Sequence, residues 1–586
     1  MYVLGISCFY HDSSATILKD GKVVAAAQEE RFTRKKHDTS FPENAIKYCL
    51  KSQNISIDDV NSIAFYEKPL LKFERILYQH LESFPKSYKI FLSNLPSWFN
   101  EKTRIIKIIK KKLKYKKDVF FVEHHMAHAA SSFLPSPFKK AAIFTIDGAG
   151  EWTTTTYGIG EKNNIKLLKE IKFPHSLGLL YSTITAYLGF SVNNSEYKVM
   201  GLSAYGNTNK KTNPYYEKLK EVINIKEDGS YNLDMSYFKY HYSNRMPSEK
   251  LCRLLGGATR NSESELTKRH KDIAAALQLI TEDLIIKALN YIYTITKCEN
   301  VILSGGVALN SVANGKILKN TPFKKIWINP DPGDGGTSMG AALYAYNVIL
   351  NNKRNFVLKK AYLGPEFSTN EIKKFLDKSK IKYSEFKNNA DLLRKSSDLI
   401  LDDKVLGWFQ GRMEWGPRAL GARSILSNPT NKKMQEILNL KVKHREKFRP
   451  FAPVVCEEDA LKYFDCDKPV PEATDFMLMV YPIFKKFHNK IPAVTHVDGS
   501  GRLQTIRRNQ NQLYFDLIKK VGKKSGIPIL INTSFNIRGE PIVCKPKDAY
   551  RCMMGTGIDC LIMDKFLIKR EDNPQDMWDS EKYAKD

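Results

Sequence analysis

The sequence predicts an α/β protein with more than one domain. Short apolar runs typical of buried strands recur along the chain, and several of them end in glycine-containing turns. Segments with apolar residues at helical spacing follow several of these turns. The chain has 586 residues, and chains of this length usually fold into about two to four domains rather than around one core.

The chain begins with a predicted strand at residues 2–7, followed by a polar turn. Residues 15–18 and 22–27 form two further strands, which Asp20 and Gly21 connect as a hairpin. This order resembles the start of actin-like ATPase and sugar-kinase domains, in which the first turn faces phosphate. On this segment alone, an ordinary hairpin explains the pattern equally well.

A dense run of charged residues occupies positions 29–38 and leads into a predicted helix at 43–52. Such runs are usually solvated faces, but a loop over a site is the alternative here. Residues 66–118 are rich in Lys, Phe, Leu and Tyr and are predicted to be mostly helical, with no identifiable chemistry. Residues 207–265 are polar and poorly periodic, which indicates an insertion, and 270–297 form a long helix.

Three of the 12 histidines lie close together, at His124, His125 and His128. Residues 120–130 contain good helix formers and no Gly or Pro. On a helix, His124 and His128 share one face, with the spacing that lets two imidazoles bind one metal ion. Asp147 ends a predicted strand soon afterwards. The pattern supports a metal site and ordinary core histidines equally, and His125 with His128 could also form the pair.

Two later strands end in glycine-rich turns. The first, at 300–304, leads into Gly305 and Gly306, and the second, at 326–328, leads into an Asp- and Gly-rich loop that contains Asp334. Glycines let backbone N–H groups approach a phosphate or ribose at a helix N-terminus. The second loop is also suited to a metal ion.

The chain turns polar at 350–368, where we expect the boundary between domains at 1–355 and 370–586. Beyond it, basic residues are interleaved with Gly, Pro and aromatic residues. Six of them fall within a short stretch: Arg412, Arg418, Arg423, Lys443, Arg445 and Arg449. Guanidinium groups bind phosphates bidentately, so this pattern favours a phosphate site over an exposed basic surface. Segments 497–502 and 529–536 fit the same pocket.

Composition narrows the functional classes. The chain carries 92 Lys and Arg against 63 Asp and Glu, a formal net charge of +29. This charge fits a generic lysine-rich surface, nucleic acid or polyphosphate substrates. No apolar run is long enough for a membrane span, and the start lacks the features of a signal peptide. The nine cysteines form no C-x-x-C pair, so we expect no disulfides and a cytoplasmic location.

These motifs together resemble the NodU/CmcH family of O-carbamoyltransferases, which modify nodulation factors, cephems, aminoglycosides and surface sugars. The resemblance extends over nearly the whole chain. Nine segments follow the family's order: HDSSA at 11–15, EERFTRKKHD at 29–38, HHMAHAA at 124–130, EYKVMGLSAYG at 196–206, LSGGVALN at 303–310, GDGGTSMGAA at 333–342, EWGPRALGARS at 414–424, KFRPFAP at 447–453 and NTSFN at 532–536.

The resemblance implies a two-lobed actin-like (ASKHA, ribonuclease-H-like) domain at 1–355, followed by a YrdC-like α/β domain at 370–586. In such enzymes the second domain makes carbamoyl-adenylate from carbamoyl phosphate and Mg-ATP. The first domain then transfers the carbamoyl group to a hydroxyl at a metal site. Fe(II), or another divalent metal in the same site, is the implied cofactor.

The resemblance also assigns site residues. The metal ligands fall on His124, His128, Asp147 and Asp334. The catalytic candidates are Asp12 as the base, His11 as its alternative, and Lys36. Nucleotide contacts in the transfer domain are implied for Lys198, Gly305, Gly306 and Asn310. Contacts to carbamoyl phosphate and ATP in the activation domain are implied for Arg418, Lys443, Arg449, Arg502 and Ser534.

Two other functions would use parts of this sequence. A tRNA threonylcarbamoyl-type modification or RNA-binding protein would use the positive charge, but the tRNA system that the chain resembles generally keeps these two domains in separate proteins. An actin-like ATPase or sugar kinase would leave the arginine-rich second half without a role.

The sequence does not specify whether the acceptor is a small molecule or a sugar. It is also compatible with a homodimer. Segments 66–118 and 207–265 match the family least, and we expect them to shape the acceptor pocket.

Overall fold

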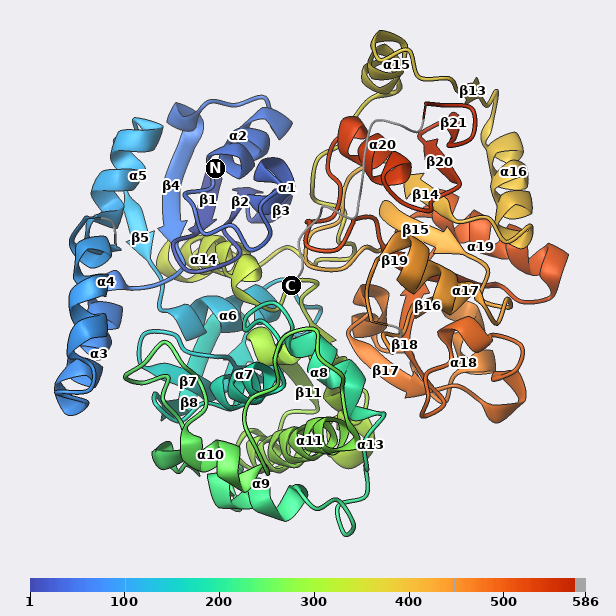
Figure 1. Cartoon of the computed structure of the whole chain (residues 1–586). Coiled ribbons are helices and arrows are strands. Elements are labelled where there is room, and N and C mark those ends of the chain that lie inside the picture. The colour runs from blue at the N-terminus through green and yellow to red at the C-terminus, as the bar shows by residue number, and fades with distance from the viewer. Residues whose placement is uncertain (101, 447, 575–586) are drawn as a thin grey trace. The chain divides into compact units, whose positions relative to one another are not determined.

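The computed structural model describes residues 1–100, 102–446 and 448–574. The chain divides into two compact units (Figure 1). The first unit contains residues 1–26 and 39–358, and the second contains 27–38 and the described residues from 359 onward.

The first unit contains two five-stranded sheets. The strands of the first sheet, in spatial order, are β3 (Lys22–Gln28), β2 (Ser14–Lys19), β1 (Tyr2–Ser7), β4 (Val60–Phe65) and β5 (Val119–Phe121). Those of the second are β8 (Asn164–Lys172), β7 (Thr153–Glu161), β6 (Lys140–Ile146), β11 (Asn300–Ser304) and β12 (Lys325–Ile328).

The two sheets repeat one topology. In each, the first strand in sequence is antiparallel to the second and parallel to the fourth, and the fifth strand is parallel to the fourth. The spatial order is therefore third, second, first, fourth, fifth in both sheets. This duplicated order is the topology of the actin-like fold, and the prediction of an α/β actin-like first domain is confirmed.

Two helices form the layer between these sheets. Helix α14 (Thr337–Tyr344) packs on β1 and β2, and α6 (His124–Phe133) packs on β6 and β11, while α14 and α6 contact each other. The helices meet closely at Gly340, where a Cβ atom would lie 1.9 Å from the carbonyl oxygen of Ala127. The sequence therefore needs glycine at this crossing.

The other helices of the first unit surround the sheets or connect their strands. They include α2 (Glu43–Ser52), α3 (Pro69–Glu82), α4 (Tyr88–Asn100), α5 (Ile105–Leu113), α7 (Leu177–Tyr187), α8 (Glu196–Ser203), α9 (Tyr216–Val222), α10 (Glu249–Leu254) and α11 (Lys268–Thr296). The predicted long helix corresponds to α11. The predicted irregular insertion at 207–265 is more ordered than expected, because it contains α9, α10 and the two-stranded sheet of β9 (Ile223–Ile225) and β10 (Tyr231–Leu233).

The second unit is built on one mixed nine-stranded sheet. Its strands, in spatial order, are β13 (Ser384–Glu385), β21 (Phe566–Lys569), β20 (Cys560–Met563), β14 (Leu406–Phe409), β15 (Arg423–Ser427), β19 (Ile529–Ser534), β16 (Ala452–Cys456), β18 (Ser500–Ile506) and β17 (Met479–Pro482). Helices α16 (Asn389–Leu401) and α19 (Gln512–Ser525) contact each other and share a buried core with Trp408 and Leu530 of the sheet. The unit is therefore α/β, as predicted.

The charge run at 29–38 belongs to this second unit rather than to a solvated face. Arg31 is buried and donates a hydrogen bond to the carbonyl of Gly416 (3.0 Å). Arg34 donates to the carbonyls of Pro541 and Ile542, both at 2.6 Å. Buried guanidinium groups are stable when they are paired in this way, so these arginines fix the segment to the unit.

The sequence predicted neither disulfides nor a membrane-spanning segment. None of the nine cysteines forms a disulfide. Among the described residues, no helix combines the length and the apolar character that crossing a bilayer requires.

Candidate metal centre and anion site

Helix α6 presents two histidines on one face near its N-terminus. His124 is its first residue, and His128 follows one turn later. The buried Glu151 accepts hydrogen bonds from the backbone N–H of His124 at 3.0 and 3.1 Å, which compensates the unpaired amides of the helix start and suits the helix dipole. Asp147 directly follows β6, and Asp334 begins a short 3-10 turn after β12. Sequence reasoning missed Glu151, because its partner is a backbone amide.

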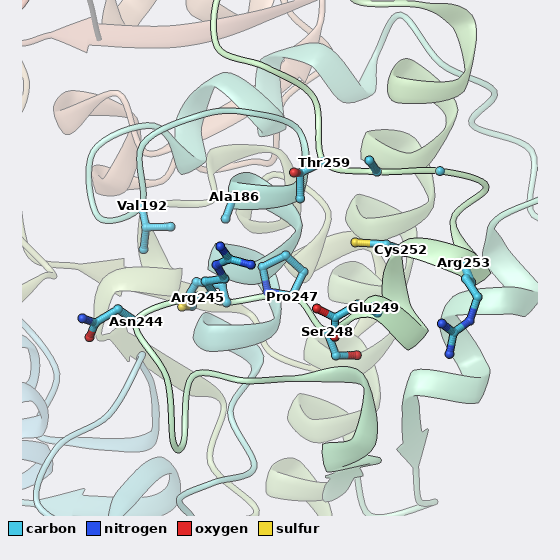
Figure 2. A pocket seen from close by; sticks show the side chains of 13 residues that line it. Ala186, Val192, Asn244, Arg245, Pro247, Ser248, Glu249, Cys252, Arg253 and Thr259 are labelled. Atoms are coloured by element: carbon cyan, nitrogen blue, oxygen red, sulfur yellow. The ribbon is translucent and has the colours of Figure 1, made fainter. Parts of the chain in front are cut away.

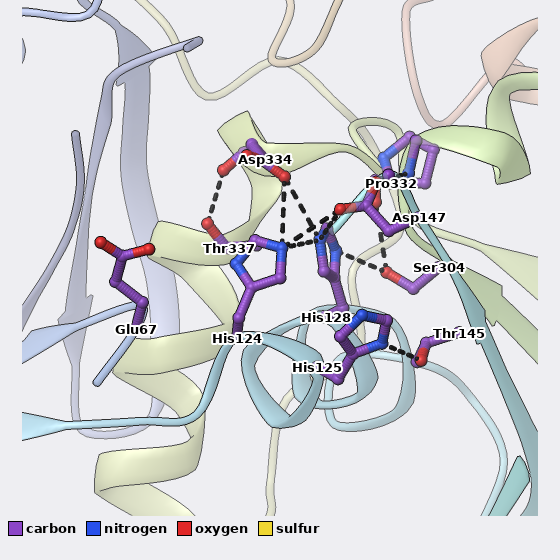
Figure 3. Close-up of polar contacts among 12 residues, drawn as sticks. Glu67, His124, His125, His128, Thr145, Asp147, Ser304, Pro332, Asp334 and Thr337 are labelled. Carbon is purple, nitrogen blue, oxygen red and sulfur yellow. Dashed lines mark hydrogen bonds and ion pairs between the residues drawn. The ribbon is translucent and has the colours of Figure 1, made fainter. Parts of the chain in front are cut away.

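The structure brings His124, His128, Asp147 and Asp334 together (Figure 3). The two imidazole Nε2 atoms are 3.1 Å apart. Asp147 Oδ2 lies 3.2 Å from His124 Nε2, and Asp334 Oδ1 lies 3.3 Å from His128 Nε2. All four residues are buried. Four such atoms placed tetrahedrally around one ion with bonds of about 2.0–2.2 Å would be separated by roughly 3.3–3.6 Å. The observed separations run from 3.1 to 3.8 Å, so the four side chains could hold a metal ion with small adjustments.

The chemistry of the four side chains agrees with this spacing. Two imidazoles and two carboxylates form a mixed N/O donor set that suits Fe(II), Mn or Zn. Apart from the imidazoles of His11, His124 and His128, neither carboxylate oxygen of the buried Asp334 has a partner among the described residues, although a buried carboxylate normally requires such compensation. Asp147 Oδ1, in contrast, accepts a hydrogen bond from the N–H of Gly306 at 2.8 Å, which orients this side chain.

The pKa values show that this point of the molecule favours positive charge. Burial opposes the charged form of His128, but hydrogen bonds with Asp147 and Asp334 outweigh it and raise the pKa of His128 to about 9. Burial also opposes the charged form of Asp147, yet His124 and His128 hold its pKa well below the usual value. The two carboxylates therefore compensate a cation at this position.

His125 is turned away from the cluster. Its ring points to Thr145 (Figure 3), and its Nδ1 lies 2.7 Å from the hydroxyl of that residue. Burial, together with the nearby His124 and His128, holds the pKa of His125 well below its usual value. Of the two pairs that the sequence left open, the structure thus groups His124 with His128.

The catalytic candidates His11 and Asp12 lie beside the cluster. His11 Nδ1 is 2.9 Å from Asp12 Oδ2, and its Nε2 is 3.5 Å from Asp334 Oδ2. Burial lowers the pKa of His11, but Asp334 and Asp12 outweigh it, and the pKa is raised well above its usual value. Lys36, the third candidate, belongs to segment 27–38 of the second unit.

The predicted nucleotide contacts of the first unit have partners within the protein. The N–H of Gly305 donates to the carbonyl of Pro332 at 2.8 Å, and that of Gly306 donates to Asp147. The side chain of Asn310 accepts a hydrogen bond from the N–H of Ala313 and exchanges hydrogen bonds with Gln278. Lys198 is buried on α8. Their role in nucleotide binding stays a prediction.

Gly305 cannot be replaced without strain. Its φ is +93°, and a Cβ atom would lie 2.1 Å from the carbonyl oxygen of Ile146. We expect Gly305→Ala to lower the free energy of unfolding of this unit by about 2 kcal/mol or more, measured by thermal or urea denaturation. Gly148→Ala is the matched control, because no atom lies within 4 Å of its Cβ position. Equal stability of the two variants would contradict this explanation.

Strand pairing brings the predicted activation residues to one end of the second unit's sheet. Strand β19 is antiparallel to β15 and β16, and β16 is parallel to β18. The end of β19 therefore lies beside the starts of β15, β16 and β18. The predicted residues occur at these positions: Arg418 before β15, Arg449 before β16, Arg502 near the start of β18, and Ser534 at the end of β19.

Lys443 is fixed at the same end of the sheet. Its ammonium group donates to Ser534 Oγ (3.3 Å), to the Asn536 carbonyl (3.0 Å) and to Asn536 Oδ1 (2.8 Å). Burial, and then the cations Arg445 and Arg449, hold its pKa well below the usual value. A cation destabilised in this way gains most from a bound anion. Asn536 was not singled out from the sequence, because asparagine after a strand is common.

Two arginines of the predicted basic cluster have structural roles instead. Arg412 donates to the carbonyls of Leu363 and Gly364. Arg423 is fully buried, stacks on the ring of Phe409 with its guanidinium carbon 3.6 Å from the ring centroid, and donates to the carbonyls of Gln410 and Gly411. These two guanidinium groups hold the loop around 410–423 in place. They are therefore not available to bind phosphate, and the predicted phosphate site contains fewer of the six basic residues.

A separate open cavity of about 1030 Å³ lies in the first unit. Its lining comes mostly from residues 244–259, with Ala186 and Val192, and includes Arg245, Arg253 and Glu249 (Figure 2). The cavity adjoins the C-terminal end of α7, whereas the N-terminal Ser176 of this helix donates hydrogen bonds to the carbonyls of Asp147 and Gly148. A helix rises about 1.5 Å per residue, so the cavity is distinct from the cluster of histidines and aspartates.

Both units of the chain match models of one known protein family. Residues 2–343 match the model of the carbamoyltransferase N-terminus, and residues 397–570 match that of the carbamoyltransferase C-terminus. An uncharacterised protein of Synechocystis sp. is 43% identical over 98% of this chain and 97% of its own. Nodulation protein NolNO of Sinorhizobium fredii is 34% identical over 97% of this chain and 80% of its own. Nodulation protein NolO of Bradyrhizobium diazoefficiens is 33% identical over 77% and 79%, respectively.

The family models cover most of both units, and these relatives align along most of the chain. The resemblance found in the sequence motifs is thereby confirmed. The chain belongs to the carbamoyltransferase family, and the protein is a carbamoyltransferase enzyme.

Proposed function

We propose that the protein is an ATP-dependent O-carbamoyltransferase that works in two steps. The second unit, as a YrdC-like domain, makes carbamoyl-adenylate from carbamoyl phosphate and ATP. The first unit transfers the carbamoyl group to a hydroxyl of a small molecule or sugar. The observation that carries this proposal is the buried cluster of two histidines and two aspartates in the actin-like unit, separate in the chain from the cationic end of the second sheet.

In the activation step, Lys443 with Arg418, Arg449 and Arg502 would bind the phosphates of the two anionic substrates. Carbamoyl phosphate loses phosphate to water and leaves carbamate, whose oxygen attacks the α-phosphorus of ATP. Pyrophosphate leaves. Formation of one adenylate therefore consumes one water and releases one phosphate and one pyrophosphate. Ser534, whose hydroxyl accepts a hydrogen bond from Lys443, would hydrogen-bond the adenylate.

In the transfer step, His124, His128, Asp147 and Asp334 would hold a divalent metal such as Fe(II). When bound, the metal supplies Lewis-acid polarisation of an oxygen. Asp12 is the proposed base that takes the proton of the acceptor hydroxyl as its oxygen attacks the carbamoyl carbon, and AMP leaves. His11 contacts both Asp12 and Asp334, so it would orient the base relative to the cluster.

The test is the coupling between the two substrates. We expect purified protein to release pyrophosphate from ATP only when carbamoyl phosphate is present, and AMP to follow as water hydrolyses the adenylate in the absence of an acceptor, measured by a pyrophosphate assay and nucleotide chromatography. ATP with inorganic phosphate in place of carbamoyl phosphate is the control. Release of ADP, or ATP turnover that does not depend on carbamoyl phosphate, would overturn the proposal.

A further inference from the structure

Helix α3 is amphipathic in the reverse of the usual sense. Leu70, Leu77 and Leu81 follow one another at helical spacing and face solvent, with Leu70 70% and Leu81 67% exposed. Leu71 and Tyr78 widen the same exposed stripe. A surface helix of a globular protein normally turns such a stripe toward the core, so this one requires an explanation.

The polar side of α3 is fixed inside the unit. Lys72 is buried, forms an ion pair with Glu67 at 2.6 Å and lies 4.6 Å from the ring centroid of Tyr10. Arg75 is buried over the ring of Phe173, also at 4.6 Å. Turning the helix over would bury the leucines, but it would break these contacts. The orientation is therefore determined by both sides of the helix.

The apolar stripe continues into α4. Phe84 is 67% exposed and packs edge-to-face against Tyr88, which is 54% exposed, and Leu92 follows one turn later. We call this region the α3–α4 surface, and its members are Leu70, Leu71, Leu77, Tyr78, Leu81, Phe84, Tyr88 and Leu92. These eight are among 19 exposed large apolar residues in the described chain. Such a concentration marks an interaction site.

The surroundings of this surface are strongly basic. Residues 66–118 contain 14 Lys and Arg against five Asp and Glu. Lys86 and Lys89 are exposed between the apolar residues, and Lys107, Lys110 and Lys111 are exposed on α5. Figure 1 shows α3, α4 and α5 along one side of the first unit. Because Glu74 and Glu82 lie on the stripe itself, the positive excess comes from its flanks.

We propose that the α3–α4 surface docks onto a lipid bilayer that carries anionic headgroups. Leucines and aromatic rings enter the boundary between headgroups and acyl chains, and the flanking lysines bind the anionic headgroups. A second copy of the chain fits less well, since a two-fold contact would bring two such basic segments toward each other. The site would keep the enzyme beside acceptors held at a membrane.

The test is flotation of the purified full-length protein with vesicles. We expect flotation with phosphatidylcholine vesicles that contain about one-third phosphatidylglycerol and weak flotation with phosphatidylcholine alone. Leu70→Ser/Leu81→Ser/Phe84→Ser should reduce binding at least about tenfold. The control Leu168→Ser/Ile295→Ser/Ile349→Ser changes exposed residues elsewhere in the unit and should bind as the original protein does. Thermal unfolding checks that both variants are folded.

A second experiment tests the contribution of the lysines on α5 to vesicle binding. Lys110→Glu/Lys111→Glu should lower binding to the anionic vesicles several-fold, and added salt should have the same effect. Absence of binding to anionic vesicles would overturn the proposal. A dimer in light scattering that the triple serine variant converts to a monomer, without vesicle binding by either protein, would assign the surface to a second copy and would also overturn it.

Discussion

His128→Ala will abolish transfer of the carbamoyl group and leave formation of carbamoyl-adenylate largely intact. His128 is completely buried, and its Nε2 lies between the carboxylates of Asp147 and Asp334. Its removal takes one of four donors from the cluster and leaves two buried carboxylates close together. We expect at least about a 100-fold loss of transfer, since changes even in the residues that support metal ligands cost 10- to 100-fold.

The two steps can be followed separately. Adenylate formation is measured with purified protein as carbamoyl phosphate-dependent release of pyrophosphate. Transfer is measured by mass spectrometry, as the carbamoyl mass gain in metabolites and glycans of cells that express each variant. Metal content, by elemental analysis, should fall with transfer. The matched control is His125→Gln, on the same helix but turned toward Thr145. Loss of both steps, or of neither, in His128→Ala would contradict the division of labour.

The sequence predicted the local elements that carry the four residues of this cluster, but it did not predict the strand pairing that brings them together. The i,i+4 spacing of His124 and His128 depends only on a local helix, which the helix-forming residues around them specify. Asp147 and Asp334 stood out because each follows an apolar strand before glycine. The grouping of all four requires that β6 and β12 end at the same edge of one sheet, with β11 between them, and this long-range pairing is not visible in a single sequence.

The surroundings of the basic side chains do not follow from the sequence, because charge alone does not say whether a side chain contacts solvent, a carbonyl or a ligand. Arg423 looked like a phosphate ligand, yet it is buried against Phe409 and backbone carbonyls. Arg31 looked solvated and is buried. On α3, the apolar positions had helical spacing, but the spacing could not show that this stripe faces outward. In each case the outcome depends on tertiary partners far away in sequence.

Lys443→Met will slow adenylate formation by about 30- to 1,000-fold. This factor corresponds to about 2–4 kcal/mol, the cost of removing one partner of a buried charged pair, which here is Lys443 and a substrate phosphate. The ammonium group is buried beside Ser534 and Asn536, so no mobile surface lysine can take its place. Lys441→Met is the matched control, because Lys441 is two residues away and exposed. Pyrophosphate release gives the measurement, and equal rates in the two variants would show that Lys443 binds no substrate phosphate.

The pH dependence tests the same assignment independently of overall rate. Burial, Arg445 and Arg449 hold the pKa of Lys443 well below its usual value in the free protein, and a bound phosphate would raise it. Binding of carbamoyl phosphate should therefore be accompanied by proton uptake in the range between these two pKa values. As the pH rises through the lower of them, Lys443 loses its charge and KM for carbamoyl phosphate should increase. Lys443→Met removes the titrating group, so this rise in KM should disappear in the variant, whereas Lys441→Met should retain it. A KM profile identical in the original protein and in Lys443→Met would assign the anion to the arginines alone.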